Sequence, residues 1–309
     1  MDSKKERKAH KKAYKKARRK FIQPWKIFTI LCLVVTLITT PVGMALKLFD
    51  NTAVLFLGGT FWELVDEDPN AIYYESDFAT EQERNEAGAK LVKQVEAEGA
   101  ALLTNINNTL PLSQNAKVSL FSTSSVNIVY GGTGSGNVDA SKAKSLKDSL
   151  IASGISVNET LWNWYASEEI SGAYGRGGAA GGQVQDSAGY TDILPPGGKI
   201  NEVPWDKYTD EVKNTFAEYG DAAIAIFSRI GGEGADCTFE GDNYLALEPN
   251  EKEMMKQLKA LKDAGTIKKI IVLINTSNAL QLDFLKENEY GVDSVMWIGG
   301  TGAYGLEAV

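Results

Sequence analysis

Apolar residues are distributed along this chain in two different ways. From Ile27 to Leu46 there are twenty consecutive residues without a charge, IFTILCLVVTLITTPVGMAL. As an α-helix this stretch would rise about 30 Å, which matches the hydrocarbon core of a bilayer. Farther along the chain, apolar positions fall into short runs separated by polar segments. The first pattern predicts one transmembrane helix over 27–46, and the second predicts a globular domain.

The short apolar runs alternate with amphipathic segments. Five runs are typical of strands, namely AALLT, VSLFS, AAIAIFS, IIVLIN and SVMWIG. The last three are almost continuously hydrophobic, as expected of strands covered on both faces. Helical patterns lie over 80–99, 140–152, 206–219 and 250–264, the first opened by the capping sequence TEQE and the last followed by Gly265. This order predicts an α/β fold with a mostly parallel sheet sandwiched between helices, and ligands at the carboxyl ends of its strands.

Charge separates the two parts of the chain. The first 26 residues hold 12 Lys or Arg against two acidic residues, a sum of +10, so the rest carries −18 and the whole −8. Lys and Arg collect on the cytoplasmic side of a membrane helix. We therefore expect a basic cytoplasmic tail at 1–26, a signal anchor in the cytoplasmic membrane at 27–46 and an extracytoplasmic linking segment at 47–79. A cleaved secretory signal is the alternative, with Gly43-Met44-Ala45 as a weak cleavage site.

Composition and spacing exclude several kinds of chemistry. His10 lies in the basic tail and is the one histidine, so Ser-His or Cys-His catalysis and His-ligated metals are excluded from the folded part. Cys32 and Cys237 are too few for a disulfide framework. The glycines of 131–136 follow a strand expected near Ile128, which suggests a nucleotide loop, but Asn137 stands where a dinucleotide fingerprint needs Gly or Ala and a P-loop needs Lys. An acidic exported domain also repels phosphate, so no nucleic-acid partner is expected.

One acidic residue follows the strand AAIAIFS inside a glycine-rich segment. The sequence SRIGGEGADC places Glu233 between glycines, and their lack of side chains lets a carboxyl group reach into a cleft. Carboxyl groups whose pKa is raised by their surroundings are the general acids of sugar-cleaving enzymes. The spacing by itself also fits a solvated loop acid for Glu233, and helix-start residues for Asp242 and Glu251.

Several segments together resemble the α/β sandwich domain of glycoside hydrolase family 3, the β-glucosidases and related exo-acting enzymes. They are SRIGGEGADC, GDNYLAL, EKEMMKQLKALKDAGTIKKIIVLINTSNALQL, EAEGAALLTNINNTLPLS and YGGTGSGNV. The likeness covers about residues 73–309, and we assign the domain to 80–309. It implies that Glu233 is the general acid/base and that Arg229 and Asp236 shape the substrate-binding site. A β-linked oligosaccharide or glucoside is the implied substrate, and no metal or organic cofactor is implied, because proton transfer and a carboxylate nucleophile suffice.

The chain also departs from this family. Leu103-Thr104-Asn105 stands where members usually have Leu-Lys-Asn, and Cys237 stands where Arg often follows the acid segment. Members carry the nucleophilic Asp on a (β/α)8 barrel of about 250 residues, which no stretch of this chain is long enough to form. We expect part of a membrane-anchored retaining exo-β-glycosidase, with its sandwich incomplete at the C-terminus, its barrel missing, and no activity by itself. The alternative is a non-catalytic, membrane-tethered carbohydrate-binding or interaction protein.

Overall fold

The computed structural model divides the chain into two compact units, Met1–Ser76 and Asp77–Val309. The residues that it describes are 3–48, 54, 70, 76–132, 138–176, 200–230 and 244–309. Each unit is organised by one of the two hydrophobic patterns in the sequence.

A single helix, α1 (Ser3–Leu48), contains both the basic residues and the apolar stretch. Within the described residues it is the one helix long and apolar enough to cross a membrane. Its apolar side chains are exposed, with Leu37 as much as 77% accessible. The hydroxyls of Thr29, Thr36 and Thr39 donate to backbone carbonyls four residues earlier. These threonine hydroxyls are therefore satisfied within the helix, as expected of polar groups in a segment surrounded by lipid.

The second unit is built on a six-stranded sheet with the order β1-β8-β7-β6-β2-β3. Its strands are β1 (Ala101–Asn105), β2 (Lys117–Phe121), β3 (Ser156–Val157), β6 (Ala222–Arg229), β7 (Ile270–Thr276) and β8 (Ser294–Trp297). Every neighbouring pair is parallel except β1 and β8, which are antiparallel. A separate antiparallel pair joins β4 (Gly175–Arg176) to β5 (Ile200–Asn201). The strands predicted from the five apolar runs are confirmed, and the prediction of a mostly parallel sheet is confirmed with them.

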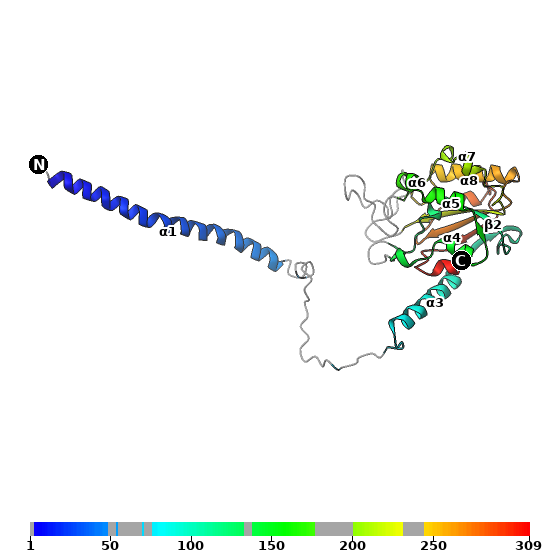
Figure 1. Ribbon diagram of the computed structural model, residues 1–309, viewed down its shortest axis with the longest axis horizontal. Coiled ribbons are helices and arrows are strands. Elements are labelled where there is room, and N and C mark those ends of the chain that lie inside the picture. The colour runs from blue at the N-terminus through cyan, green and yellow to red at the C-terminus, as the bar shows by residue number, and fades with distance from the viewer. Residues whose placement is uncertain are drawn as a thin grey trace. The chain divides into compact units, whose positions relative to one another are not determined.

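Helices cover both faces of the sheet, as predicted. Figure 1 shows α5, α6, α7 and α8 over one face and α4 on the other side. The helices of this unit are α3 (Glu81–Gly99), α4 (Leu146–Ala152), α5 (Glu159–Ala166), α6 (Glu168–Ala173), α7 (Asp210–Lys213) and α8 (Pro249–Asp263). Short 3-10 turns are η1 (Ile106–Asn108), η2 (Thr123–Ser125), η4 (Ala140–Lys142), η5 (Trp205–Lys207), η6 (Asp283–Leu285) and η7 (Gly305–Glu307).

Two hydrophobic clusters lie on opposite faces of the sheet. Every residue of β6 and β7 is buried. Along β6, Ala223 and Phe227 belong to one cluster, whereas Ile224 and Ile226 belong to the other. This alternation follows from the two-residue period of a strand, so a strand covered on both faces has apolar residues at most positions.

Local structure differs from the predictions in three places. The prediction of a strand near Ile128 is wrong, because residues 126–130 form a loop after η2, in which Ile128 and Val129 are buried. The helix expected over 140–152 consists of η4 and α4, since Ser145 caps a new start by accepting from the Asp148 N–H. The helix expected over 206–219 is likewise η5 followed by the short α7. Hydroxyl caps interrupt these amphipathic patterns, because a side-chain oxygen competes for the backbone donors.

Candidate functional site

Buried polar residues gather where the parallel strands end. Ser122 follows β2, Ser228 and Arg229 end β6, and Asn275 and Thr276 end β7, all of them buried. Burying polar groups costs free energy unless each finds a hydrogen-bonding partner. These residues therefore form connected networks, and the carboxyl ends of the strands are the part of the fold where a functional site is expected.

Asn275 joins the strand ends to one another. Its Oδ1 accepts from the Val129 N–H at 2.7 Å and from the Ser228 hydroxyl at 2.6 Å. Its Nδ2 donates to the carbonyls of Val129 at 2.9 Å and Gly299 at 2.7 Å. One side chain thus satisfies both donors and both acceptor positions of its amide. It holds the loops after β2 and β8 against the ends of β6 and β7.

Arg229 forms the most deeply buried ion pair among the described residues. Its side chain is 1% exposed and that of its partner Glu251 is fully buried. Nη1 lies 3.0 Å from Glu251 Oε1 and Nη2 lies 2.7 Å from Oε2, a bidentate arrangement. Burial lowers the pKa of Arg229, but the charge and hydrogen bonds of Glu251 more than offset this, and the pKa is raised. Arg229 is therefore charged in the interior.

The remaining donors of Arg229 bind the backbone. Nε donates to the Tyr244 carbonyl at 2.8 Å, Nη2 to the Ala246 carbonyl at 2.8 Å, and Nη1 to the Ser228 carbonyl at 3.0 Å. With the two bonds to Glu251, all five N–H groups of the guanidinium are engaged. The substrate-binding role expected for Arg229 stays a prediction, and in this geometry a sugar hydroxyl would have to displace an internal bond.

The predicted acid/base lies in a stretch whose two borders are bonded to each other. Glu233 and Asp236 fall within 231–243, outside the described residues. The N–H of Ile230, just before the stretch, donates to Tyr244 Oη at 2.8 Å, and Tyr244 follows the stretch. The same hydroxyl donates to the Ile230 carbonyl at 3.4 Å. These two hydrogen bonds therefore hold Ile230, where the chain leaves β6, next to Tyr244, the first described residue after the stretch.

Glu251 is a helix-start residue, as expected, and it also forms the buried ion pair with Arg229. It stands at the N3 position of α8, where its carboxylate accepts from the Glu248 N–H while the Glu248 carboxylate caps the helix. The pattern Glu248-Pro249-Asn250-Glu251 is a readable capping sequence. Its pairing with Arg229 is a tertiary contact across 22 residues. Sequence reasoning missed that pairing.

A second buried carboxyl group, Glu202, extends the network. It is fully buried and accepts from the Thr123 N–H at 2.9 Å, the Thr123 hydroxyl at 3.1 Å and the Val203 N–H at 3.0 Å. Burial raises the pKa of Glu202 to about 7, although the hydrogen bonds lower it. Its own N–H donates to Glu248 Oε1 at 2.9 Å, which links it to the helix start. Nothing in the local pattern of the sequence marked this residue.

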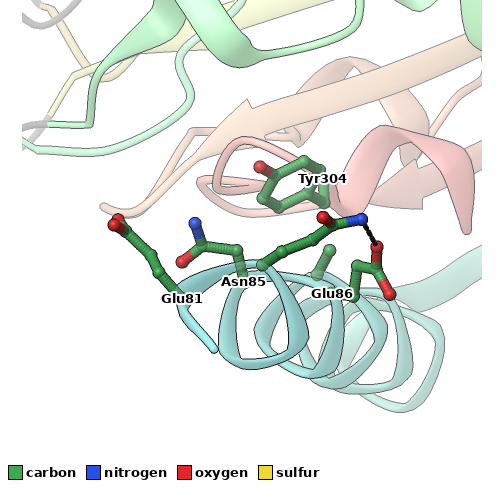
Figure 2. Close-up of a pocket in the computed structure, with 6 residues that line it drawn as sticks. Glu81, Asn85, Glu86 and Tyr304 are labelled. Carbon is green, nitrogen blue, oxygen red and sulfur yellow. Dashed lines mark hydrogen bonds between the residues drawn. The ribbon is translucent and has the colours of Figure 1, made fainter. Parts of the chain in front are cut away.

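Two surface hollows among the described residues differ in whether ionisable side chains line them. Figure 2 shows one of about 510 Å³, where Tyr304 faces the first turns of α3 and Gln82 donates to Glu86. Its carboxyl groups, on Glu81 and Glu86, stand exposed on a helix surface. Another, of about 320 Å³, lies beside the end of β7 against Trp297, and none of its lining residues is ionisable. Within the described part, no three His, Cys, Asp or Glu gather as a metal site.

Comparison with known proteins identifies relatives of the second unit. The family model for the glycosyl hydrolase family 3 C-terminal domain matches residues 100–309. A β-glucosidase of Ruminococcus albus is 30% identical over 216 residues, covering 68% of this chain and 20% of the relative. A β-glucosidase A of Butyrivibrio fibrisolvens is 29% identical over 206 residues, covering 66% of this chain and 21% of the relative. The chain therefore spans about a fifth of the length of these curated relatives.

Solved structures agree with this result. β-Glucosidase 3B of Thermotoga neapolitana, in complex with glucose, superposes with a TM-score of 0.55 at 25% identity, covering 72% of this chain and 29% of that one. A β-glucosidase from Paenibacillus barengoltzii superposes with a TM-score of 0.58 at 24% identity, covering 72% of this chain and 22% of that one. The Paenibacillus structure supports the fold, and the Thermotoga structure supports both the fold and the family.

Proposed function

Because the chain belongs to glycoside hydrolase family 3, we propose that its second unit is the α/β sandwich part of a retaining β-glucosidase. The observation that carries the proposal is the family match over 100–309, in which β6 leads directly into the stretch containing Glu233. We assign the general acid/base to Glu233 and a role in shaping the sugar site to Asp236. The substrate class is a β-linked glucoside or oligosaccharide, in keeping with the glucose bound in the Thermotoga structure.

The proposed reaction needs a second carboxyl group from a (β/α)8 barrel. An Asp of that barrel attacks the anomeric carbon while Glu233 protonates the departing oxygen, leaving a covalent glycosyl-enzyme. Glu233 then removes a proton from water, which attacks the same carbon and releases the sugar with retained configuration. This chemistry requires the two carboxyl groups to lie about 5–5.5 Å apart. The sandwich contributes the proton donor, from the stretch that follows β6 in the sequence, and the barrel contributes the nucleophile.

We further propose that α1 holds the enzyme at the cytoplasmic membrane as a single-pass signal anchor. The support is its exposed apolar stretch of twenty uncharged residues, preceded by a tail with a charge of +10. The positive-inside rule places that tail in the cytoplasm and the acidic sandwich outside. The alternative, a secretory signal removed after export, would leave the sandwich in the same compartment but free of the membrane.

An activity assay with a matched pair of variants tests the acid/base assignment. The 309-residue chain alone is expected not to turn over an aryl β-glucoside. Together with a family 3 barrel domain, on the same or a second polypeptide, it is expected to do so. Glu233→Gln should lower kcat on an alkyl β-glucoside by about 10²- to 10⁴-fold, the usual contribution of a general acid. Glu240→Gln, in the same stretch, should retain activity.

Two outcomes would contradict the proposal. Ready turnover by the isolated chain, abolished in Glu233→Gln, would show that the nucleophile is not missing. Full activity of Glu233→Gln in the combined enzyme would remove the acid/base role. Failure of every barrel combination to give turnover would favour the non-catalytic alternative, a tethered carbohydrate-binding or interaction protein, which glucan binding would then test.

A further inference from the structure

We propose that Arg229, Glu251 and Tyr244 are positioning residues that hold the acid/base stretch in place without touching the sugar. The inference rests on the proposed role of Glu233 and assigns Arg229 an indirect role in the same reaction. It starts from the fact that all five guanidinium N–H groups already bind protein acceptors.

The bonds of Arg229 reach both sides of the stretch 231–243. Arg229 itself belongs to β6, which precedes the stretch, whereas the carbonyls of Tyr244 and Ala246 follow it. Glu251 adds the first turn of α8 to the same cluster. One side chain therefore ties together the departing strand, the returning chain and the following helix.

Tyr244 closes the stretch with a second set of contacts. Its hydroxyl bonds both the N–H and the carbonyl of Ile230, and the Arg229 guanidinium carbon lies 5.6 Å from the centroid of its ring. Covalent geometry keeps the Cα of Glu233 within about 11 Å of that of Ile230, since each residue spans at most about 3.6 Å. Ile230 is therefore the described residue from which the chain runs to the proposed acid/base.

The buried charge makes the arrangement sensitive to substitution. Removing one partner of a fully desolvated ion pair leaves the other charge uncompensated in the interior. A Lys at position 229 keeps the charge but replaces a planar fork of five donors by a single ammonium group, which cannot bind Glu251 in a bidentate manner and reach both carbonyls. The catalytic carboxyl group should then be misplaced rather than lost.

A kinetic test separates positioning from sugar binding and from general damage. A dinitrophenolate leaving group departs without protonation, whereas an alkoxide requires the general acid. In the combined enzyme, Arg229→Lys and Tyr244→Phe should lower kcat/KM on methyl β-glucoside by about tenfold or more, a part of the full contribution of a general acid. The loss of kcat/KM on 2,4-dinitrophenyl β-glucoside should be much smaller, because kcat/KM reports the steps up to the glycosyl-enzyme, and KM for methyl β-glucoside should stay within about twofold. Lys262→Met, which removes the partly buried pair with Asp293 at the other end of α8, should behave as wild type.

Kinetic results of two other kinds would overturn the proposal. A raised KM with unchanged kcat would mean that Arg229 binds the sugar directly. An equal loss of kcat/KM on both substrates, with KM unchanged, would mean that the cluster acts only through overall stability. Tyr244→Phe guards against a folding failure, because it removes a hydroxyl and leaves the ion pair intact.

Hydrogen exchange on the 309-residue chain in detergent micelles supplies a readout independent of activity. Amides of 228–230 and 244–248 should exchange at least about tenfold faster in Arg229→Lys and Glu251→Gln than in Lys262→Met, while those of β7 stay unchanged. Unchanged exchange at these borders would overturn the positioning role. Absence of turnover from the wild-type combination would instead contradict the proposed function, so the two failures are distinguishable.

Discussion

At the scale of single residues, Glu202 shows how burial changes the chemistry of a carboxyl group. Two backbone N–H groups and the Thr123 hydroxyl donate to its carboxyl group, and all three donors are neutral. Burial raises its pKa to about 7, from an ordinary value of 4.5. The folded state therefore holds the proton more tightly than the unfolded chain. Its contribution to stability is fully present below about pH 4.5 and is lost as the pH rises through 7.

Replacing Glu202 by Gln should remove this pH dependence. We expect the free energy of unfolding of the wild type to fall, relative to Glu202→Gln, by on the order of 3 kcal/mol between pH 4.5 and pH 8. Urea unfolding of the two proteins across this range measures the difference, with Glu98→Gln on the exposed face of α3 as the control. If the difference between Glu202→Gln and wild type stays constant with pH, Glu202 is not the buried titrating group described above.

At the scale of elements, the amino ends of β6 and β7 are set by a close approach of two turns. Gly220 precedes β6, and a Cβ added there would lie 2.2 Å from the carbonyl oxygen of Thr266 and 3.0 Å from that of Phe216. The Gly220 carbonyl in turn accepts from the Lys268 N–H at 2.8 Å. Both obstructing atoms belong to the backbone, so they cannot yield by a change of rotamer. The absence of a side chain at this position allows the two central strands to start side by side.

Gly220→Ala should therefore destabilise the second unit. Forcing the two turns apart should cost about 2–3 kcal/mol, at the upper end for overpacked sites. Gly88→Ala is the matched control, because an added Cβ in the middle of α3 meets no atom within 4 Å. That change should be neutral or stabilising by about 0.5–1 kcal/mol. Thermal and urea unfolding followed by circular dichroism compare the two, and equal stability would refute the close approach.

At the scale of the whole molecule, charge and hydropathy divide the chain into two contrasting parts. The tail carries +10 and the remainder −18, with the uncharged stretch between them. The apolar side chains of that stretch are exposed in the helix. Burial in a lipid bilayer would remove this apolar area from water, a favourable transfer of about 25 cal/mol per Å².

The proposed membrane anchor predicts where the protein is found in the cell. The intact chain should remain in the membrane fraction after carbonate extraction, and the sandwich should be digested by a protease added outside the cell while the tail is protected. A version that begins at Asp77, the start of the second compact unit, should be released. N-terminal sequencing of the exported protein provides the control for cleavage. A mature N-terminus just after Ala45 would show that the segment is a cleaved secretory signal and not an anchor.

Much of the fold was readable from local patterns. The runs AAIAIFS, IIVLIN and SVMWIG became β6, β7 and β8, because central strands with cover on both faces are apolar at most positions. The end of α8 was equally local, since Gly265 adopts a φ of 77°, which favours glycine. The capping role of Thr80 was confirmed by its bond from the Glu83 N–H, but Glu83 accepts from Ala79 instead of closing the box on Thr80.

The sequence by itself thus determined the strands, the apolar helix, the charge division and the likeness to a family, because each is written in neighbouring residues. Only the tertiary structure decided that β1 runs antiparallel at the sheet edge, that Ile128 lies in a buried loop, and that Arg229 pairs with Glu251. It also decided that Glu202 is buried beside Thr123, 79 residues away in the chain. These features depend on which distant groups share a desolvated space, where hydrogen-bonding partners and pKa values are set by surroundings that no local pattern records.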